Sequence, residues 1–192
     1  MTVPEALAED AAARSSAHAS LIGRFVVPAA VVAELPAERP PLSVVLGSLD
    51  DVALVSGIEG VEAVELRLSA PRPESRELLS MRSALAPLGV ETYFELIFAE
   101  RWRDDVPAAI GAVAAIGGRV KLRCGGAHVP SVEQVAAVIA CCRHAGVPFK
   151  ATAGLHHALH RGEEHGFLNL LAAACAPRDR LEHVLAEEDA RS

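Results

Sequence analysis

The sequence predicts an α/β protein whose parallel strands form an incomplete or distorted TIM-like (β/α) barrel. Three observations lead to this fold class. The chain of 192 residues is 51% hydrophobic but only 4% aromatic, which is typical of helices packed on a parallel sheet. Period-2 apolar runs alternate with helical patterns along nearly the whole chain. The turns between these runs are short and rich in Gly and Pro.

About six strand–helix units follow one another along the chain. The runs with strand character are 24–28, 43–47, 61–68, 90–98, 119–124 and 147–154. The helical patterns that follow them are 29–35, 49–58, 74–89, 104–117, 131–146 and a helical tail from about Glu163. The helix at 131–146 has clear boundary signals, because Ser131 precedes two acidic or amide residues and Gly146 follows Ala145.

A repeated strand–helix unit implies parallel strands joined by right-handed crossovers. A complete eight-stranded barrel usually needs about 200 to 250 residues, so this chain is short by roughly two units. Three arrangements remain open: an open or distorted barrel, a barrel closed by two chains, and a doubly wound sheet. We expect one domain over 1–192, with an N-terminal helical segment (1–22), the strand–helix repeats (23–162) and C-terminal helices (163–192).

Composition and charge exclude several classes of protein. The net charge is −7 and no run is rich in lysine, so we expect no nucleic-acid partner. The apolar stretches are well under the roughly 18 to 20 residues that span a bilayer, and the N-terminus lacks a signal-peptide pattern. These features predict a cytoplasmic protein without membrane contact. The four cysteines form no CxxC pair, so neither a disulfide framework nor a zinc site is expected.

Four consecutive predicted strands each have an apolar face and a polar face, since residues two apart in a strand share a face. Phe94, Leu96 and Phe98 are expected on an apolar face, opposite Tyr93 and Glu95. If helices cover the apolar faces, the polar residues line the interior near the strand ends. These polar residues are Glu65, Arg67, Tyr93, Glu95, Lys121, Arg123, Lys150 and Thr152.

Two interpretations of these charges compete. The charges could pair with one another as a structural network, but buried ion pairs are weak evidence for stability. Perturbed charges in clefts tend to mark functional sites, and four cations against two anions favour an anionic ligand. We therefore expect a small anionic metabolite as the partner, with Arg123, Arg67, Glu65, Tyr93, Thr152, His156 and His157 as its contacts.

Lys150 is the centre of the predicted chemistry. A lysine beside other cations and partly removed from water has a lowered pKa, which frees its amine to attack a carbonyl. The predicted catalytic residues are therefore Lys150, with Lys121 and Glu95 beside it. No cofactor and no bound metal are expected.

The histidines after the last strand offer a competing centre. His156 and His160 would share one helix face if that stretch were helical, and two such imidazoles could share a metal ion. The GG pair at 125–126 could hold a phosphate through its N–H groups, although such a pair is more often a tight turn. Asn169, in an apolar run, needs a hydrogen-bond partner if it is buried.

The segment "KLRCGG…PSVEQVAAVIACCRHAGVPFKATAG" resembles deoxyribose-phosphate aldolase and its class I aldolase relatives. The resemblance covers about 35 residues and rests on Lys150, Thr152 and the turn at Ala145 and Gly146. It implies a Schiff-base role for Lys150. The stretches "KLRCGG", "PFKATAGLHH" and "HGFLNLLAAA" also resemble an uncharacterised family of mostly actinobacterial proteins, which implies a bacterial protein but no activity.

Together these features predict a lyase or isomerase that acts on a small anionic carbonyl or carboxylate compound. Two alternatives stay open: a barrel that binds such a compound without converting it, and a metal-dependent hydrolase that uses His156, His157 and His160. An uncovered parallel-sheet edge favours association, so we expect a homodimer.

Overall fold

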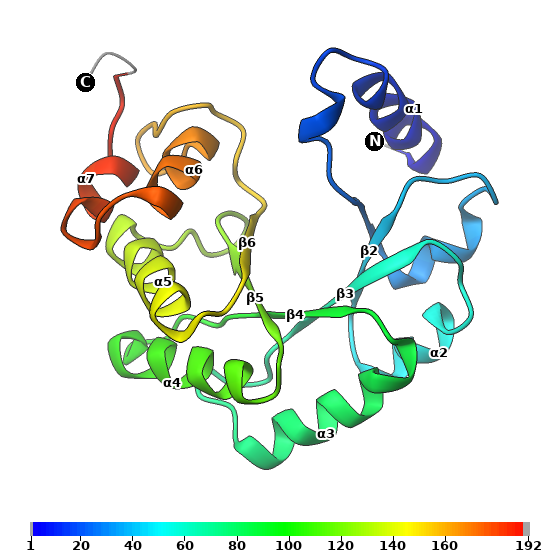
Figure 1. Cartoon of the computed structure of the whole chain (residues 1–192), viewed down its shortest axis with the longest axis horizontal. Coiled ribbons are helices and arrows are strands. Elements are labelled where there is room, and N and C mark those ends of the chain that lie inside the picture. Colours follow the sequence, from blue (N-terminus) through cyan, green and yellow to red (C-terminus); the bar gives the residue numbers. More distant parts are fainter. Residues whose placement is uncertain (1, 190–192) are drawn as a thin grey trace. The chain divides into compact units, whose positions relative to one another are not determined.

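The computed structural model describes residues 2–189 and has the predicted class. Six parallel strands alternate with helices, and along the sheet they keep their order in the chain, β1-β2-β3-β4-β5-β6 (Figure 1). A doubly wound sheet reverses its strand order at a switch point, whereas a (β/α) barrel does not. The sequential order therefore identifies an incomplete TIM-like (β/α) repeat of six units.

The strands lie close to the predicted runs. They are β1 (Phe25–Pro28), β2 (Leu42–Leu46), β3 (Val61–Arg67), β4 (Glu91–Glu95), β5 (Arg119–Arg123) and β6 (Phe149–Thr152). The α-helices are α1 (Val3–Arg14), α2 (Val52–Val55), α3 (Ser75–Leu85), α4 (Trp102–Ala115), α5 (Val132–Ala145), α6 (Phe167–Cys175) and α7 (Leu181–Leu185). The crossover at 29–35 is a 3₁₀ helix, Ala29–Glu34, rather than an α-helix.

The chain divides into two compact units. The first contains Met1–Leu66 and Ser83–Thr92, and the second contains Arg67–Arg82 and Tyr93–Ser192. In the first unit β2 pairs in parallel with both β1 and β3, and its core is aliphatic, with Leu42, Val44 and Val64 fully buried. The prediction of one domain stays a prediction.

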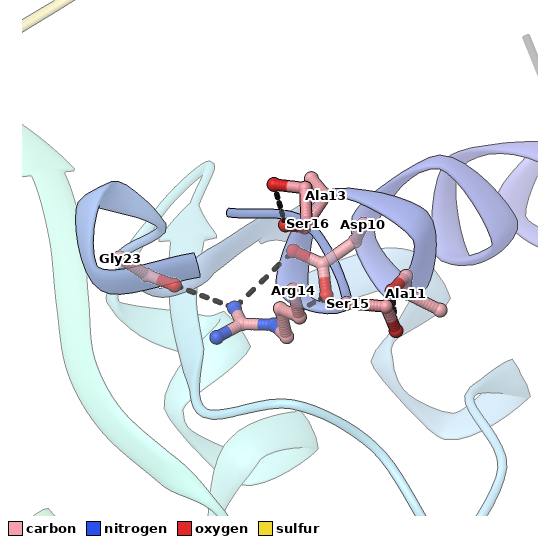
Figure 2. Close-up of polar contacts among 7 residues, drawn as sticks. All are labelled: Asp10, Ala11, Ala13, Arg14, Ser15, Ser16 and Gly23. Atoms are coloured by element: carbon pink, nitrogen blue, oxygen red, sulfur yellow. Dashed lines mark hydrogen bonds and ion pairs between the residues drawn. The ribbon is translucent and has the colours of Figure 1, made fainter. Parts of the chain in front are cut away.

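Helix α1 of the first unit is held by polar contacts. It begins with a capping box between Thr2 and Glu5 and buries no side chain. At its end Arg14 Nε contacts Asp10 Oδ2 at 2.6 Å, and Arg14 Nη2 donates to the Gly23 carbonyl at 2.5 Å (Figure 2). One arginine thus fastens the end of the helix to the segment that enters β1.

In the second unit β5 pairs in parallel with β4 and β6. Helices α4 and α5 pack on each other and both contact β5. Phe94, Val120 and Leu122 of the strands are buried against this helical layer, together with Ile110, Val113, Val135, Val138 and Ile139. Each such aliphatic side chain stabilises the fold by about 1.5 to 3 kcal/mol on burial.

Helix α5 ends as predicted. Ser131 accepts a hydrogen bond from the Gln134 amide, the Gln134 side chain accepts from the Ser131 amide, and Gly146 closes the helix at φ +65°. The C-terminal tail differs from the prediction, because α6 begins at Phe167 rather than near Glu163. Residues 153–166 form a loop that contains two short bridges, one between His157 and Gly166 and one between Arg161 and Glu164. None of the described helices has both the length and the apolar content to cross a membrane.

Candidate functional site

A pocket of about 310 Å³ lies at the carboxyl ends of β4 and β5, within the second unit. Barrel enzymes place their chemistry at this end of the strands. Its walls are formed by charged side chains at three strand ends and by residues of the loops after β4 and β5. The lining residues are Arg67, Glu95, Leu96, Ile97, Phe98, Arg123, Ala127 and His128.

Glu95 is the anion of this pocket and contacts two cations. Lys121 Nζ lies 2.8 Å from Glu95 Oε2, and both side chains are nearly buried, with 6% and 12% exposed. Arg67 Nε lies 3.9 Å from Glu95 Oε1, but the Arg67 side chain is 67% exposed. Because screening by water weakens an exposed contact, the Lys121 pair holds the carboxylate more firmly than Arg67 does.

Glu95, Lys121 and Lys150 form one row across three strands. Glu95 of β4 is the register partner of Lys121 of β5, and Lys121 is the register partner of Lys150 of β6. Neighbouring strands lie about 4.8 Å apart, and in-register residues of parallel strands share a face. The structure therefore brings the three predicted catalytic residues together on the polar face of the sheet.

Tyr93 and Thr152 are two polar residues near Lys150. Lys150 Nζ lies 4.4 Å from the centre of the Tyr93 ring, which is a favourable cation–π distance. Thr152 is two residues further on the same strand face, and its hydroxyl is buried with no hydrogen-bond partner among the described residues. A buried polar atom of this kind is usually satisfied by water or a ligand.

Arg123 of β5 is the register partner of Thr152 of β6. Its side chain is exposed, and Nε donates to the Gly125 carbonyl at 2.9 Å, which holds the guanidinium at the pocket wall. Gly125 in turn touches the backbone of Gly154, because a Cβ placed on Gly125 would lie 2.5 Å from Gly154 Cα. Gly125 therefore serves a close approach of two loops, and the phosphate contact considered for the pair at 125–126 stays a prediction.

His156 and His157, which we predicted to contact the substrate, are not among the residues that line this pocket. His156 is exposed, and His157 Nε2 lies 2.7 Å from Glu164 Oε2 in the loop after β6. The condition under which His156 and His160 would share a helix face is not met, since this stretch is a loop with short bridges at 157–166. Within residues 2–189 no group of three or more His, Cys, Asp or Glu side chains is arranged to hold a metal ion.

Glu65 belongs to the first unit. It is 1% exposed and accepts a hydrogen bond from the Ser43 hydroxyl at 2.7 Å. Its predicted contact with a substrate stays a prediction.

Sequence reasoning missed part of the pocket. Phe98 was expected on the apolar face of a strand extending to 98, but β4 ends at Glu95 and the Phe98 ring lies 5.8 Å from the ring of His128. Leu96 and Ile97 also line the pocket, and no periodic signal marks a residue just beyond a strand end. Cys124, next to the site, is buried, and burial raises the pKa of its thiol to about 12. It is therefore a protonated, inert thiol near neutral pH.

The clearest missed signal is the use of lysine itself. Of the 18 Lys and Arg residues, only residues 121 and 150 are lysine. Arginine stays charged under all working conditions, whereas a lysine amine can lose its proton and attack a carbonyl. The two positions where the chain uses lysine are the two that pair across β5 and β6.

No protein-family model matches the chain, and no curated protein matches its sequence. The chemistry of the pocket and of the two paired lysines therefore carries the functional inference.

Proposed function

We propose that the protein is a lyase or isomerase that binds a small anionic carbonyl or carboxylate compound and activates it through Lys150. The observation that carries this proposal is the row of Glu95, Lys121 and Lys150 beside a pocket whose walls include two arginines. A structural ion-pair network does not require lysine at both positions, since arginine forms such pairs at least as well.

The roles of the residues follow from their contacts. Arg67 and Arg123 bind the anionic group of the substrate at the pocket wall, and Thr152 donates its hydroxyl hydrogen to a substrate oxygen. Lys121 contacts the Glu95 carboxylate at 2.8 Å, which suits it to the handling of protons. We assign the covalent role to Lys150, whose Nζ lies 4.4 Å from the centre of the Tyr93 ring. Glu95 exchanges a proton with the reacting compound, with Lys121 stabilising the carboxylate between proton transfers.

The covalent step is the formation of an iminium ion. The Lys150 amine adds to the carbonyl carbon, and the carbonyl oxygen leaves as water after it has taken up two protons, so that a protonated C=N bond replaces the C=O bond. This cation draws electrons from the neighbouring carbon. A C–C bond or a C–H bond at that carbon then breaks, which gives lyase or isomerase chemistry respectively. The likeness of the segment around β5 and β6 to class I aldolases supports the same role for Lys150.

Reductive trapping tests the proposal. The protein is incubated with sodium borohydride and one carbonyl compound at a time: pyruvate, glyceraldehyde 3-phosphate, dihydroxyacetone phosphate, and acetaldehyde as the compound without an anionic group. We expect a covalent adduct with at least one anionic compound, with a mass gain equal to one substrate molecule less one oxygen atom, and less adduct with acetaldehyde. Lys150→Arg keeps a cation beside Tyr93 but cannot form an imine, so this variant should lose the adduct.

The remaining outcomes separate the alternatives. No adduct with any compound, together with no product in the reaction mixtures, contradicts the covalent lysine mechanism. Thermal stabilisation by the same compounds without adduct or product indicates a barrel that binds and does not convert its ligand. An activity that disappears on treatment with a chelator and returns with a divalent metal indicates metal-dependent hydrolysis.

A further inference from the structure

His165 is a buried imidazole outside the row of catalytic residues. It lies in the loop between β6 and α6 and is 1% exposed. Its Nε2 atom lies 2.6 Å from the Pro130 carbonyl oxygen. A carbonyl oxygen only accepts, so Nε2 carries the proton and Nδ1 has the lone pair. Among the described residues, nothing forms a hydrogen bond with this buried Nδ1 atom.

The loop that carries His165 is also held by hydrogen bonds of the Asn169 side chain. Asn169 of α6 accepts a hydrogen bond from the His160 amide and donates to the carbonyl oxygens of Val184 and Glu187, each at 2.8 Å. A side chain at position 166 has no room, since a Cβ there would lie 2.1 Å from Asn169 Oδ1. The buried amide therefore has the partners it needs, and it fixes the loop after β6 to α6 and to the end of the α7 region.

Pro130 belongs to the loop that connects β5 to α5. The same loop contains Ala127 and His128, which line the pocket, and Ser131, which caps α5. Both loops are in contact at Gly125 and Gly154. The hydrogen bond from His165 to Pro130 thus joins a firmly held loop to the loop that forms one wall of the pocket.

We propose that His165 is a positioning residue that clamps the pocket loop 125–130 in place while its imidazole is neutral, and that acid releases this clamp. The part of the proposal that concerns substrate rests on the function proposed above. The clamp itself is a property of the fold and can be tested without a substrate.

The surroundings of His165 explain the sensitivity to acid. Protonation adds a second N–H, at Nδ1, in a place where the described residues offer no acceptor. The titratable group that acts on His165 is His160, whose ring centre lies 5.8 Å away; the Pro130 carbonyl that the ring contacts is neutral. Burial, and to a smaller extent His160, lower the pKa of His165, while the Pro130 carbonyl opposes them. A buried imidazolium without an acceptor is costly, so acid drives the ring out and breaks its bond to Pro130.

Amide hydrogen exchange in residues 124–131 of the full chain tests the clamp. Exchange is measured at about pH 7.5 and pH 5.5 and corrected for the intrinsic pH dependence of exchange. We expect protection in the wild type to fall at the lower pH, by up to about tenfold, because an open state whose imidazole has its ordinary pKa of about 6.5 takes up the proton over this range. His165→Gln keeps a neutral donor at the position of Nε2, so it should retain protection at both pH values. His165→Leu should lack protection at both.

Three results would overturn the clamp: equal protection of the wild type at both pH values, an undiminished fall in His165→Gln, or loss of the fall in the control His183→Gln, which keeps His165 and changes only a side chain exposed on α7. If a His165 variant fails to fold, nitrogen NMR of the wild-type histidines decides instead. We expect the Nε2–H tautomer for His165 at neutral pH, and the Nδ1–H tautomer contradicts the proposal. The lysine adduct does not depend on these readouts, so failure of the clamp and failure of the proposed function remain distinct.

Discussion

Lys121 and Lys150 occupy paired positions on β5 and β6. Lys121 Nζ contacts the Glu95 carboxylate, and Lys150 Nζ lies over the Tyr93 ring. From these contacts we propose the proton-handling role for Lys121 and the covalent role for Lys150.

Removing the charge of Glu95 should destabilise the protein strongly. Glu95→Gln removes the carboxylate that contacts the nearly buried Lys121, and breaking a buried pair in this way costs about 3 to 5 kcal/mol. Arg67→Gln is the control, because Arg67 is largely exposed and 3.9 Å away, and exposed pairs contribute about 1 kcal/mol or less. The free energy of unfolding in urea measures both. Equal effects of the two substitutions contradict the assignment of Lys121 as the main partner of Glu95.

The contact between the two loops should depend on Gly125. In Gly125→Ala the new methyl group meets the Gly154 backbone at 2.5 Å, so the loops must separate, and we expect a loss of about 1 to 3 kcal/mol together with weaker ligand binding. Gly111→Ala in α4 is the control, since nothing lies within 4 Å of its added Cβ. Alanine is the better helix former by about 1 kcal/mol, so this control should be stabilised. A neutral or stabilising effect of Gly125→Ala argues against the loop contact.

The free energy of unfolding should fall with acid through the titration of His165. Its pKa in the folded protein is lowered by burial, whereas the unfolded chain takes up the proton near pH 6.5. The unfolded state therefore binds more protons below about pH 6.5, and stability decreases by up to about 1.4 kcal/mol per pH unit until the folded pKa is reached. Above that range the contribution is fully present. Urea unfolding from pH 7.5 to 5 measures the slope, which His165→Gln should reduce; an unchanged slope in this variant assigns the effect to other groups.

The fold was predictable because its signals are local and periodic. The alternation of Val120, Lys121, Leu122 and Arg123 gives the two faces of β5, and Ser131 and Gly146 mark the ends of α5 in the sequence. The helical tail was placed too early, because the polar stretch before Phe167 has helix-compatible residues and is held as a loop by short bridges within the loop itself. Such irregular pairing leaves no periodic pattern.

The row of Glu95, Lys121 and Lys150 was predictable from the pleat, since parallel strands place alternate residues on one face. The pocket wall was not. Phe98 and His128 come together because β4 ends three residues earlier than its apolar pattern suggests, and their contact joins two loops. The need of Asn169 for partners was predictable, but the partners themselves were not, because they lie in the loop before α6 and at the end of the α7 region.

The location of the trapped adduct tests the central claim most directly. Because the chain has only two lysines, peptide mapping of the borohydride-reduced protein distinguishes Lys150, Lys121 and the N-terminal amine without ambiguity. Lys121→Arg keeps a cation against Glu95, so this variant should still form the adduct, while Lys150→Arg should not. We predict that the adduct lies on the peptide containing Lys150; an adduct found only on Lys121 or only on the N-terminal amine contradicts the assignment of Lys150 as the nucleophile.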